Sequence, residues 1–168
     1  MTATETIRAR RSIRKYKGDA IPQEHLKLIL EAAMMAPSAC NTRPWEFVVV
    51  TDPGVKQQLV EAHPYARHLN QAYAAIIVCG RPDLQENVCP GYFPQDCGAA
   101  VQNILLQAAD LGYGTCWCGV YPRQERMDAV AGVLKIENAV PFALITLGVP
   151  DEAPTPRGFY DESRVTWL

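Results

Sequence analysis

The sequence lacks any apolar run close to the ~20 residues that a membrane-spanning helix needs. Its first residues, MTATE, contain no apolar stretch of the kind found in secretory signal peptides. The formal net charge is −2, so there is no basic field to bind nucleic acid or an anionic membrane. These absences predict a cytoplasmic protein that binds a small ligand and has no nucleic-acid or membrane partner.

The cysteines and histidines lack the spacing of a metal site. Six cysteines are present but no Cys-x-x-Cys pair, and a single residue separates Cys116 from Cys118. None of His25, His63 and His68 is paired with a cysteine at zinc-binding spacing. Because secretion is not expected, neither is a disulfide framework. We therefore predict reduced, structural thiols, no metal, and surface positions for His63 and His68.

Familiar catalytic motifs are also missing. The chain contains no phosphate-binding P-loop, no Gly-x-Ser-x-Gly nucleophile elbow and no His-Glu-x-x-His zinc motif. Gly112 and Gly114 resemble the start of a dinucleotide-binding loop, but the third position of that pattern falls on Trp117. The expected order here is helix, glycine, strand, the reverse of a dinucleotide-binding fold. No catalytic side chain is predicted.

What the sequence does contain is the composition of one globular domain, residues 1–168, with 48% hydrophobic and 20% charged residues. A capping box formed by Thr2 and Glu5 predicts a short first helix. Hydrophobic periodicity and proline positions then predict the other elements. We expect helices from Pro22, over 52–62, over 95–111 and from Pro122, strands over 46–50, 74–79, 115–120 and 140–148, and a loop over 81–94 that covers the site.

A basic segment follows the first helix. If the chain is extended there, Arg10, Ser12 and Arg14 point to one side, since strand side chains alternate. Two guanidinium groups and a hydroxyl on one face can bind a phosphate or a ribityl chain through charge-assisted hydrogen bonds. The alternative is a solvated run of surface charge.

A second candidate segment, residues 37–45, reads PSACNTRPW. Two prolines bracket small polar residues, and Trp45 supplies an apolar anchor at the start of a strand. The segment could bind a ligand through its side chains and amides, or it could be only a tight connection between a helix and a strand. The apolar end of the tail, residues 150–168, favours an arm that lies on a neighbouring subunit.

These segments resemble the FMN-dependent nitroreductase family over nearly the whole chain. Residues 10–16, RRSIRKY, look like its phosphate-binding opening, and residues 37–45 look like its Pro-Ser-x-x-Asn-x-x-Pro-Trp signature. Residues 112–119 are similar to its Gly-x-Gly-x-x-Trp-x-Gly segment beside the flavin, and residues 160–163 to its C-terminal arm. The resemblance implies an α+β, nitroreductase-like fold: a mostly antiparallel sheet flanked by helices, in an intertwined homodimer.

The resemblance also implies an FMN site shared between two subunits. Arginines near the amino terminus would bind the phosphate and ribityl chain, the Asn41 loop would come from the other subunit, and the backbone of residues 116–119 would cover the ring. Phe159 stands where the family usually has a second basic residue of the tail. The implied cofactor-binding residues are Arg10, Arg11, Ser12, Arg14, Pro37, Ser38, Ala39, Asn41, Cys116, Trp117, Cys118, Gly119 and Arg157.

The activity implied is that of an oxidoreductase, which uses NADH or NADPH to reduce nitroaromatics, quinones or similar electron-poor acceptors by ping-pong hydride transfer. In such a protein the flavin carries the chemistry, which agrees with the absence of a catalytic triad. Two alternatives remain at this point. One is a flavin-binding or flavin-processing protein without nicotinamide-driven turnover. The other is an anion-binding module without flavin.

Overall fold

The computed structural model describes residues 1–155 and 157–168. Its centre is a four-stranded sheet in the order β1-β2-β4-β3. Every neighbouring pair of strands is antiparallel. The strands are β1 (Trp45–Val50), β2 (Ala74–Gly80), β3 (Gly114–Gly119) and β4 (Val140–Gly148). All four strands that the sequence predicts are present, so the expectation of an α+β fold with an antiparallel sheet is confirmed.

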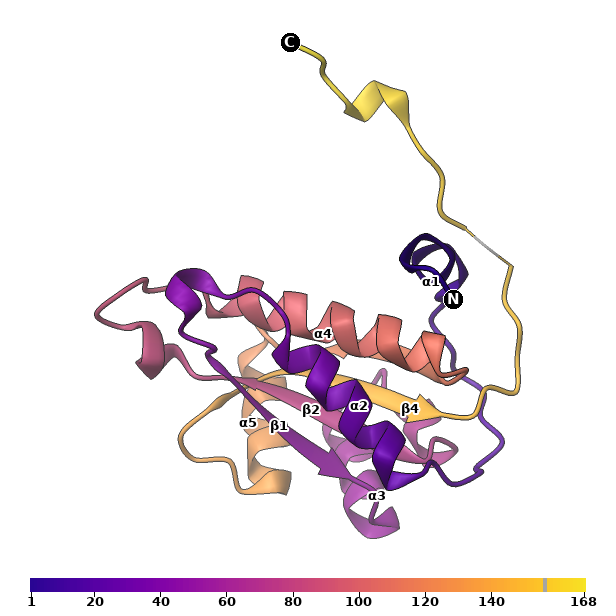
Figure 1. Ribbon diagram of the computed structural model, residues 1–168. Coiled ribbons are helices and arrows are strands. Elements are labelled where there is room, and N and C mark those ends of the chain that lie inside the picture. Colours follow the sequence, from indigo (N-terminus) through magenta and orange to yellow (C-terminus); the bar gives the residue numbers. More distant parts are fainter. Residues whose placement is uncertain (156) are drawn as a thin grey trace.

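Five α-helices accompany the sheet within the described residues (Figure 1). They are α1 (Ala3–Ala9), α2 (Gln23–Met34), α3 (Pro53–Ala62), α4 (Phe93–Asp110) and α5 (Gln124–Leu134). Short 3-10 turns are η1 (Ala39–Asn41), η2 (Arg67–Asn70), η3 (Pro82–Gln85) and η4 (Glu162–Arg164). No helix in the described part of the chain has the length and apolarity required to cross a membrane.

Two hydrophobic cores lie on opposite faces of the sheet. Along β2, Ile76 and Val78 pack with α2 and α4, while Ile77 and Cys79 pack with α3 and α5. Alternate side chains of a strand point to opposite faces, so a strand covered by helices on both sides must be apolar throughout. Every residue of β2 is buried accordingly. The result is three layers, with α4 the long helix on one side of the sheet (Figure 1).

Local signals in the sequence placed several helix ends correctly. Thr2 and Glu5 form both hydrogen bonds of the capping box on α1. Asp52 caps α3 by accepting a hydrogen bond from the Val55 amide, and Pro53 is the first helical residue. By contrast, α4 begins at Phe93 instead of residue 95. Pro94 fits inside the first turn of the helix, because backbone N–H groups there have no acceptor within the helix.

The expectation that His63 lies on the surface is wrong. The His63 ring is 1% exposed, and it lies where α3 ends, below the last residue of β3. Its Nε2 lies 2.9 Å from the Gly119 carbonyl oxygen, and the Tyr65 amide donates to its Nδ1. A carbonyl can only accept and an amide N–H can only donate, so Nε2 carries the proton. A hydrogen-bonded ring can be buried at little cost, which the spacing along the chain does not reveal.

The segment after α1 extends the sheet beyond β3. Ser12 forms a parallel bridge with Thr115, and the Ile13 amide donates to the Thr115 carbonyl at 2.8 Å. Ile13 is buried and packs against Gly114 so closely that a Cβ there would lie 2.7 Å from its side chain. Ser12 and Arg14 are exposed. The alternation expected for an extended segment is therefore confirmed.

The tail leaves the body of the molecule after Asp151 and extends past α1 (Figure 1). Its last residues are folded by local hydrogen bonds, in which Asp161 accepts from Ser163 and Arg164. Several large apolar side chains of this arm are strongly exposed in the single chain: Phe159, Tyr160, Trp167 and Leu168. Apolar surface of this kind is typical of a segment that packs on another molecule.

Candidate flavin site

A cleft of about 1150 Å³ lies between α1, the extended segment after it and the tail. Its lining contains five arginines and a single carboxylate, Glu152. It unites five of the residues that the sequence singled out as cofactor-binding: Arg10, Arg11, Ser12, Arg14 and Arg157. Arginines separated by almost the whole chain thus line one surface.

The positive charge of this cleft is largely available to a ligand. Among the residues that the structure describes, no ion pair involves an arginine of the cleft. Glu152 accepts hydrogen bonds from the backbone amides of Arg14 and Lys15. Arg11 donates to the carbonyls of Arg10 and Thr155, which orients its guanidinium. A group of guanidiniums without carboxylate partners is suited to binding a phosphate.

The loop with Asn41 lies at the other end of the molecule, against the first turn of α4. Its backbone is unusual, because three non-glycine residues, Cys40, Asn41 and Arg43, have φ between 49° and 55°. Left-handed conformations of this kind cost free energy and persist only where surrounding contacts enforce them. Ser38 Oγ accepts from the Arg43 amide at 2.9 Å, and Asn41 Oδ1 accepts from Arg43 Nε at 3.2 Å.

Asp96 and Gln85 hold this loop in place through hydrogen bonds. Asp96, only 6% exposed, accepts hydrogen bonds from the Ala39 amide at 3.1 Å and from Gln85 Nε2 at 2.7 Å. Gln85 Nε2 also donates to Thr42 Oγ1, which in turn donates to the Ala39 carbonyl. The first turn of a helix favours a carboxylate, but sequence alone could not show that this one binds a distant loop.

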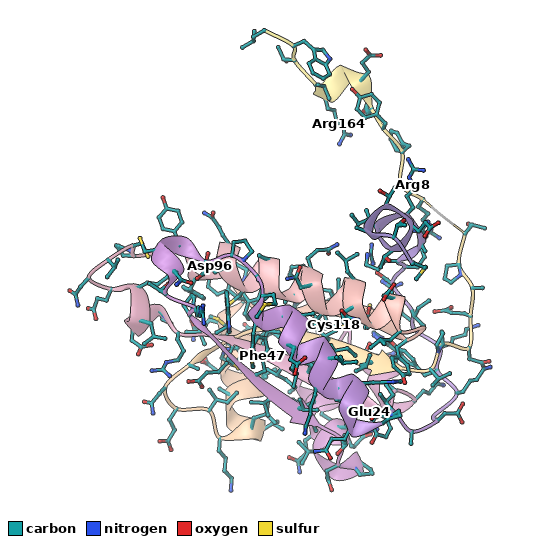
Figure 2. All side chains as sticks on the ribbon, viewed as in Figure 1. Arg8, Glu24, Phe47, Asp96, Cys118 and Arg164 are labelled. Atoms are coloured by element: carbon teal, nitrogen blue, oxygen red, sulfur yellow. The ribbon has the colours of Figure 1, made fainter. Side chains whose placement is uncertain are left out.

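A single chain does not bring the two halves of the predicted site together. The loop is bonded to Asp96, whereas α1 is bonded to Asp110 at the opposite end of α4. These residues are 14 positions apart, or ~21 Å at the helical rise of 1.5 Å per residue. Figure 2 shows Asp96 and Arg8 near opposite ends of α4. The arginines and the Asn41 loop of one chain therefore face different places.

The third predicted segment, residues 116–119, is the end of β3. Trp117 is 40% exposed and packs on Phe142 with ring centroids 6.1 Å apart. The Cys116 and Cys118 side chains point to the opposite face, into the core beneath α3 and α5. Only the backbone of these cysteines is available on the Trp117 side. The Gly119 carbonyl accepts hydrogen bonds from His63 and Arg126, which fixes the end of the strand.

Comparison with known proteins gives a consistent result. Residues 7–63 and 61–149 match the sequence model of the Nitroreductase family. A provisionally named NADH dehydrogenase/NAD(P)H nitroreductase of Methanothermobacter thermautotrophicus is 43% identical over 166 residues, which cover 98% of this chain and 86% of that protein. A protein of Bacteroides thetaiotaomicron with the same provisional name has a crystal structure that superposes with a TM-score of 0.93 at 38% identity, covering 99% of this chain and 97% of the other.

One solved relative contains the cofactor that the sequence suggests. A provisionally named nitroreductase of Desulfovibrio desulfuricans was crystallised in complex with FMN. It superposes with a TM-score of 0.85 at 29% identity, covering 100% of this chain and 97% of the other.

Proposed function

This chain belongs to the nitroreductase family, and on that premise we propose that it is an FMN-dependent oxidoreductase. It uses NADH or NADPH to reduce nitroaromatics, quinones or similar electron-poor acceptors in a ping-pong cycle. The observation that carries this proposal is the cleft of arginines without carboxylate partners beside α1. Such a cleft suits the dianionic phosphate of a mononucleotide.

The residues present fit FMN in their chemistry. Arg10 and Arg14 donate charge-assisted hydrogen bonds to the phosphate, Ser12 supplies a hydroxyl for the ribityl chain, and Arg11 and Arg157 add positive charge. Phe159 lines the same cleft where a second basic residue of the tail was expected, so the arginines near the amino terminus contribute most of the phosphate binding.

The complete site requires a second copy of the chain. The loop with Pro37, Ser38, Ala39 and Asn41 is bonded to the end of α4 opposite α1 and its arginines, so we assign this loop to the flavin bound mainly by the partner. Each chain is then one domain, residues 1–168, whose arm from about residue 150 crosses to the other subunit. Docking of this arm would remove the exposed Phe159 and Trp167 side chains from water.

The chain positions the reactants and leaves the redox chemistry to the cofactor. Bound FMN supplies a ring that accepts a hydride from the nicotinamide and returns electrons to the acceptor. Asn41, exposed on its constrained loop, would donate a hydrogen bond to the polar edge of the ring. The backbone at the end of β3 would cover the ring, and His63 and Arg126 hold Gly119 in place there. We assign no proton transfer to any side chain of this protein.

The first test is the colour and reactivity of the purified protein. We expect a yellow protein with about one FMN per chain that bleaches when NADH or NADPH is added without oxygen, and that recovers its colour when a quinone or nitroaromatic is added. The measurement is the visible absorbance in an anaerobic titration with each nicotinamide.

Two results of this titration would contradict the proposal in different ways. Flavin that stays oxidised with both nicotinamides would favour a flavin-binding or flavin-processing protein without turnover. A colourless protein that cannot be reconstituted with FMN, but still binds phosphate, would favour an anion-binding module.

A second test concerns the dimer. We expect the full chain to sediment as a dimer, and Trp167→Asp to weaken dimerisation by about 10- to 100-fold, since a buried aromatic anchor contributes roughly 2 kcal/mol or more to an interface. The measurement is sedimentation velocity over a range of concentrations, with flavin absorbance followed in the same cell. A monomer that retains its flavin would exclude the shared site.

A further inference from the structure

Three groups that bind soft metals meet beneath β3, on the face opposite Trp117. They are the imidazole of His68, from η2, and the thiols of Cys116 and Cys118, from β3. Their ligand atoms all lie within 4.8 Å of one another, and Cys118 Sγ is 3.8 Å from His68 Nε2. The two cysteines alternate with Trp117 along the strand, so both side chains point to the same face.

The sequence could not reveal this cluster, and His68 is not the plain surface residue that was expected. Its ring is half-buried and stacks on Tyr16 at a centroid distance of 6.4 Å. The two cysteines are 4% and 5% exposed. His68 and Cys116 are 48 positions apart, so only the packing of η2 under the sheet brings the third group to the pair.

These thiols also differ from the other buried cysteines. Burial raises the pKa of Cys79 and of Cys97 to about 12. The pKa of Cys116 is lowered instead, because the Cys118 thiol hydrogen-bonds to its thiolate and because His68 and Arg14 interact favourably with that charge. The pKa of Cys118 is raised, since it keeps the proton that it shares with Cys116. A thiolate is the form of cysteine that binds metals.

The distances are close to those of tetrahedral zinc. With Zn–S bonds of ~2.3 Å and Zn–N bonds of ~2.0–2.1 Å, ligand atoms lie roughly 3.5–3.8 Å apart. The contact between Cys118 Sγ and His68 Nε2, 3.8 Å, already meets this value, and the other two distances are no longer than 4.8 Å. Two thiolates and an imidazole are ligands that favour Zn²⁺ over harder cations.

We propose that His68, Cys116 and Cys118 form a three-ligand zinc site with an open fourth position. Zinc enters from the partly exposed side of His68, and both cysteines bind it as thiolates, so that any thiol proton is released on binding. No electron transfer is involved. The metal joins η2 to β3 and so stabilises the strand. This site needs neither FMN nor the dimer, so it stands or falls independently of the proposed oxidoreductase activity.

The test is metal binding by the purified full-length chain. The chain is stripped of metal with a chelator, loaded with Zn²⁺ and dialysed, after which we expect it to retain about one Zn²⁺ per chain. The zinc-loaded protein should melt at a higher temperature than the metal-free protein. When Co²⁺ replaces zinc, thiolate-to-cobalt charge-transfer bands should appear. Cys118→Ala and His68→Gln should each lower zinc affinity at least tenfold. Cys97→Ala removes an equally buried thiol from the other core and should bind as the unmodified chain does.

His68→Gln alters a half-buried residue, so it keeps the test valid should Cys118→Ala fold poorly. Circular dichroism of each variant checks its folding. The proposal is overturned if the chain binds no zinc, if all variants bind it equally, or if mass spectrometry shows Cys116 and Cys118 joined in a disulfide.

Discussion

Replacing Asp96 with alanine is expected to lower the free energy of unfolding by about 3 kcal/mol and to weaken flavin binding at least tenfold. The carboxylate is nearly fully buried and accepts from the Ala39 amide and from Gln85. Without it, the Ala39 amide loses its partner and Gln85 Nε2 loses one of its two acceptors, Thr42 Oγ1 being the other. Each donor left unsatisfied inside the protein costs about 1–3 kcal/mol. The loop with three left-handed residues then loses its main anchor.

The conservative change Asp96→Asn should have a much smaller effect. The asparagine carbonyl can still accept from Ala39, and the Gln85 amide can rotate so that its Oε1 accepts from the new amide group. That Oε1 is a buried atom without a hydrogen-bond partner among the described residues. The rotation would give Oε1 a partner, but it would also move Nε2 away from Thr42 Oγ1, so a part of the loss remains.

Asp110→Ala is a matched control at the opposite end of α4. Its carboxylate is 38% exposed and pairs with the amino terminus, and exposed ion pairs add little to stability, so we expect a much smaller loss than for Asp96→Ala. Chemical denaturation gives the stabilities, and fluorescence titration with FMN gives the affinities. If Asp96→Ala binds FMN as tightly as the unmodified chain, the Asn41 loop does not belong to the flavin site.

Arg14→Ala is expected to weaken FMN binding by ~1.5–3 kcal/mol, or about 10- to 150-fold in Kd, because it removes a charge-assisted hydrogen bond to the phosphate. The stability should change little, since the side chain is exposed and the amide that donates to Glu152 remains. The effect should shrink at high salt, which screens the charge.

Riboflavin provides an internal control for this variant, because it lacks the phosphate. The affinity for riboflavin should be nearly the same for the unmodified chain and for the Arg14→Ala variant. Arg123→Ala, at an exposed position before α5, is the matched control for loss of one surface charge and should leave FMN affinity unchanged. An Arg14 variant with unaltered FMN affinity would remove this residue from the site.

Much of the candidate site was visible in the sequence because its signals are local. The alternation of Ser12, Ile13 and Arg14 depends only on extended backbone, and the capping box of Thr2 and Glu5 depends on residues three positions apart. The roles of Gln85 and His63 gave no such signal. Gln85 lies in a loop rich in proline, and His63 follows a polar helix. The sequence around these two residues therefore does not predict that their side chains are buried.

Some features needed the packed molecule. The bond from Ala39 to Asp96 spans 57 positions and the contact from His68 to Cys118 spans 50, and no periodicity in the chain encodes either. The position of α4 also decides that the arginines and the Asn41 loop lie at opposite ends of one chain, which is the reason for proposing a shared site.

The amino-acid sequence alone determined the strands, most helix ends and the two candidate binding segments, because periodicity, capping and proline act over a few residues. The antiparallel α+β fold was expected from the resemblance of the sequence to the nitroreductase family. Only the tertiary structure decided which distant groups meet: the arginine cleft, the support beneath the loop, and the cluster of two cysteines and a histidine. Such meetings depend on how helices pack on both faces of the sheet, and that packing is a property of the whole chain.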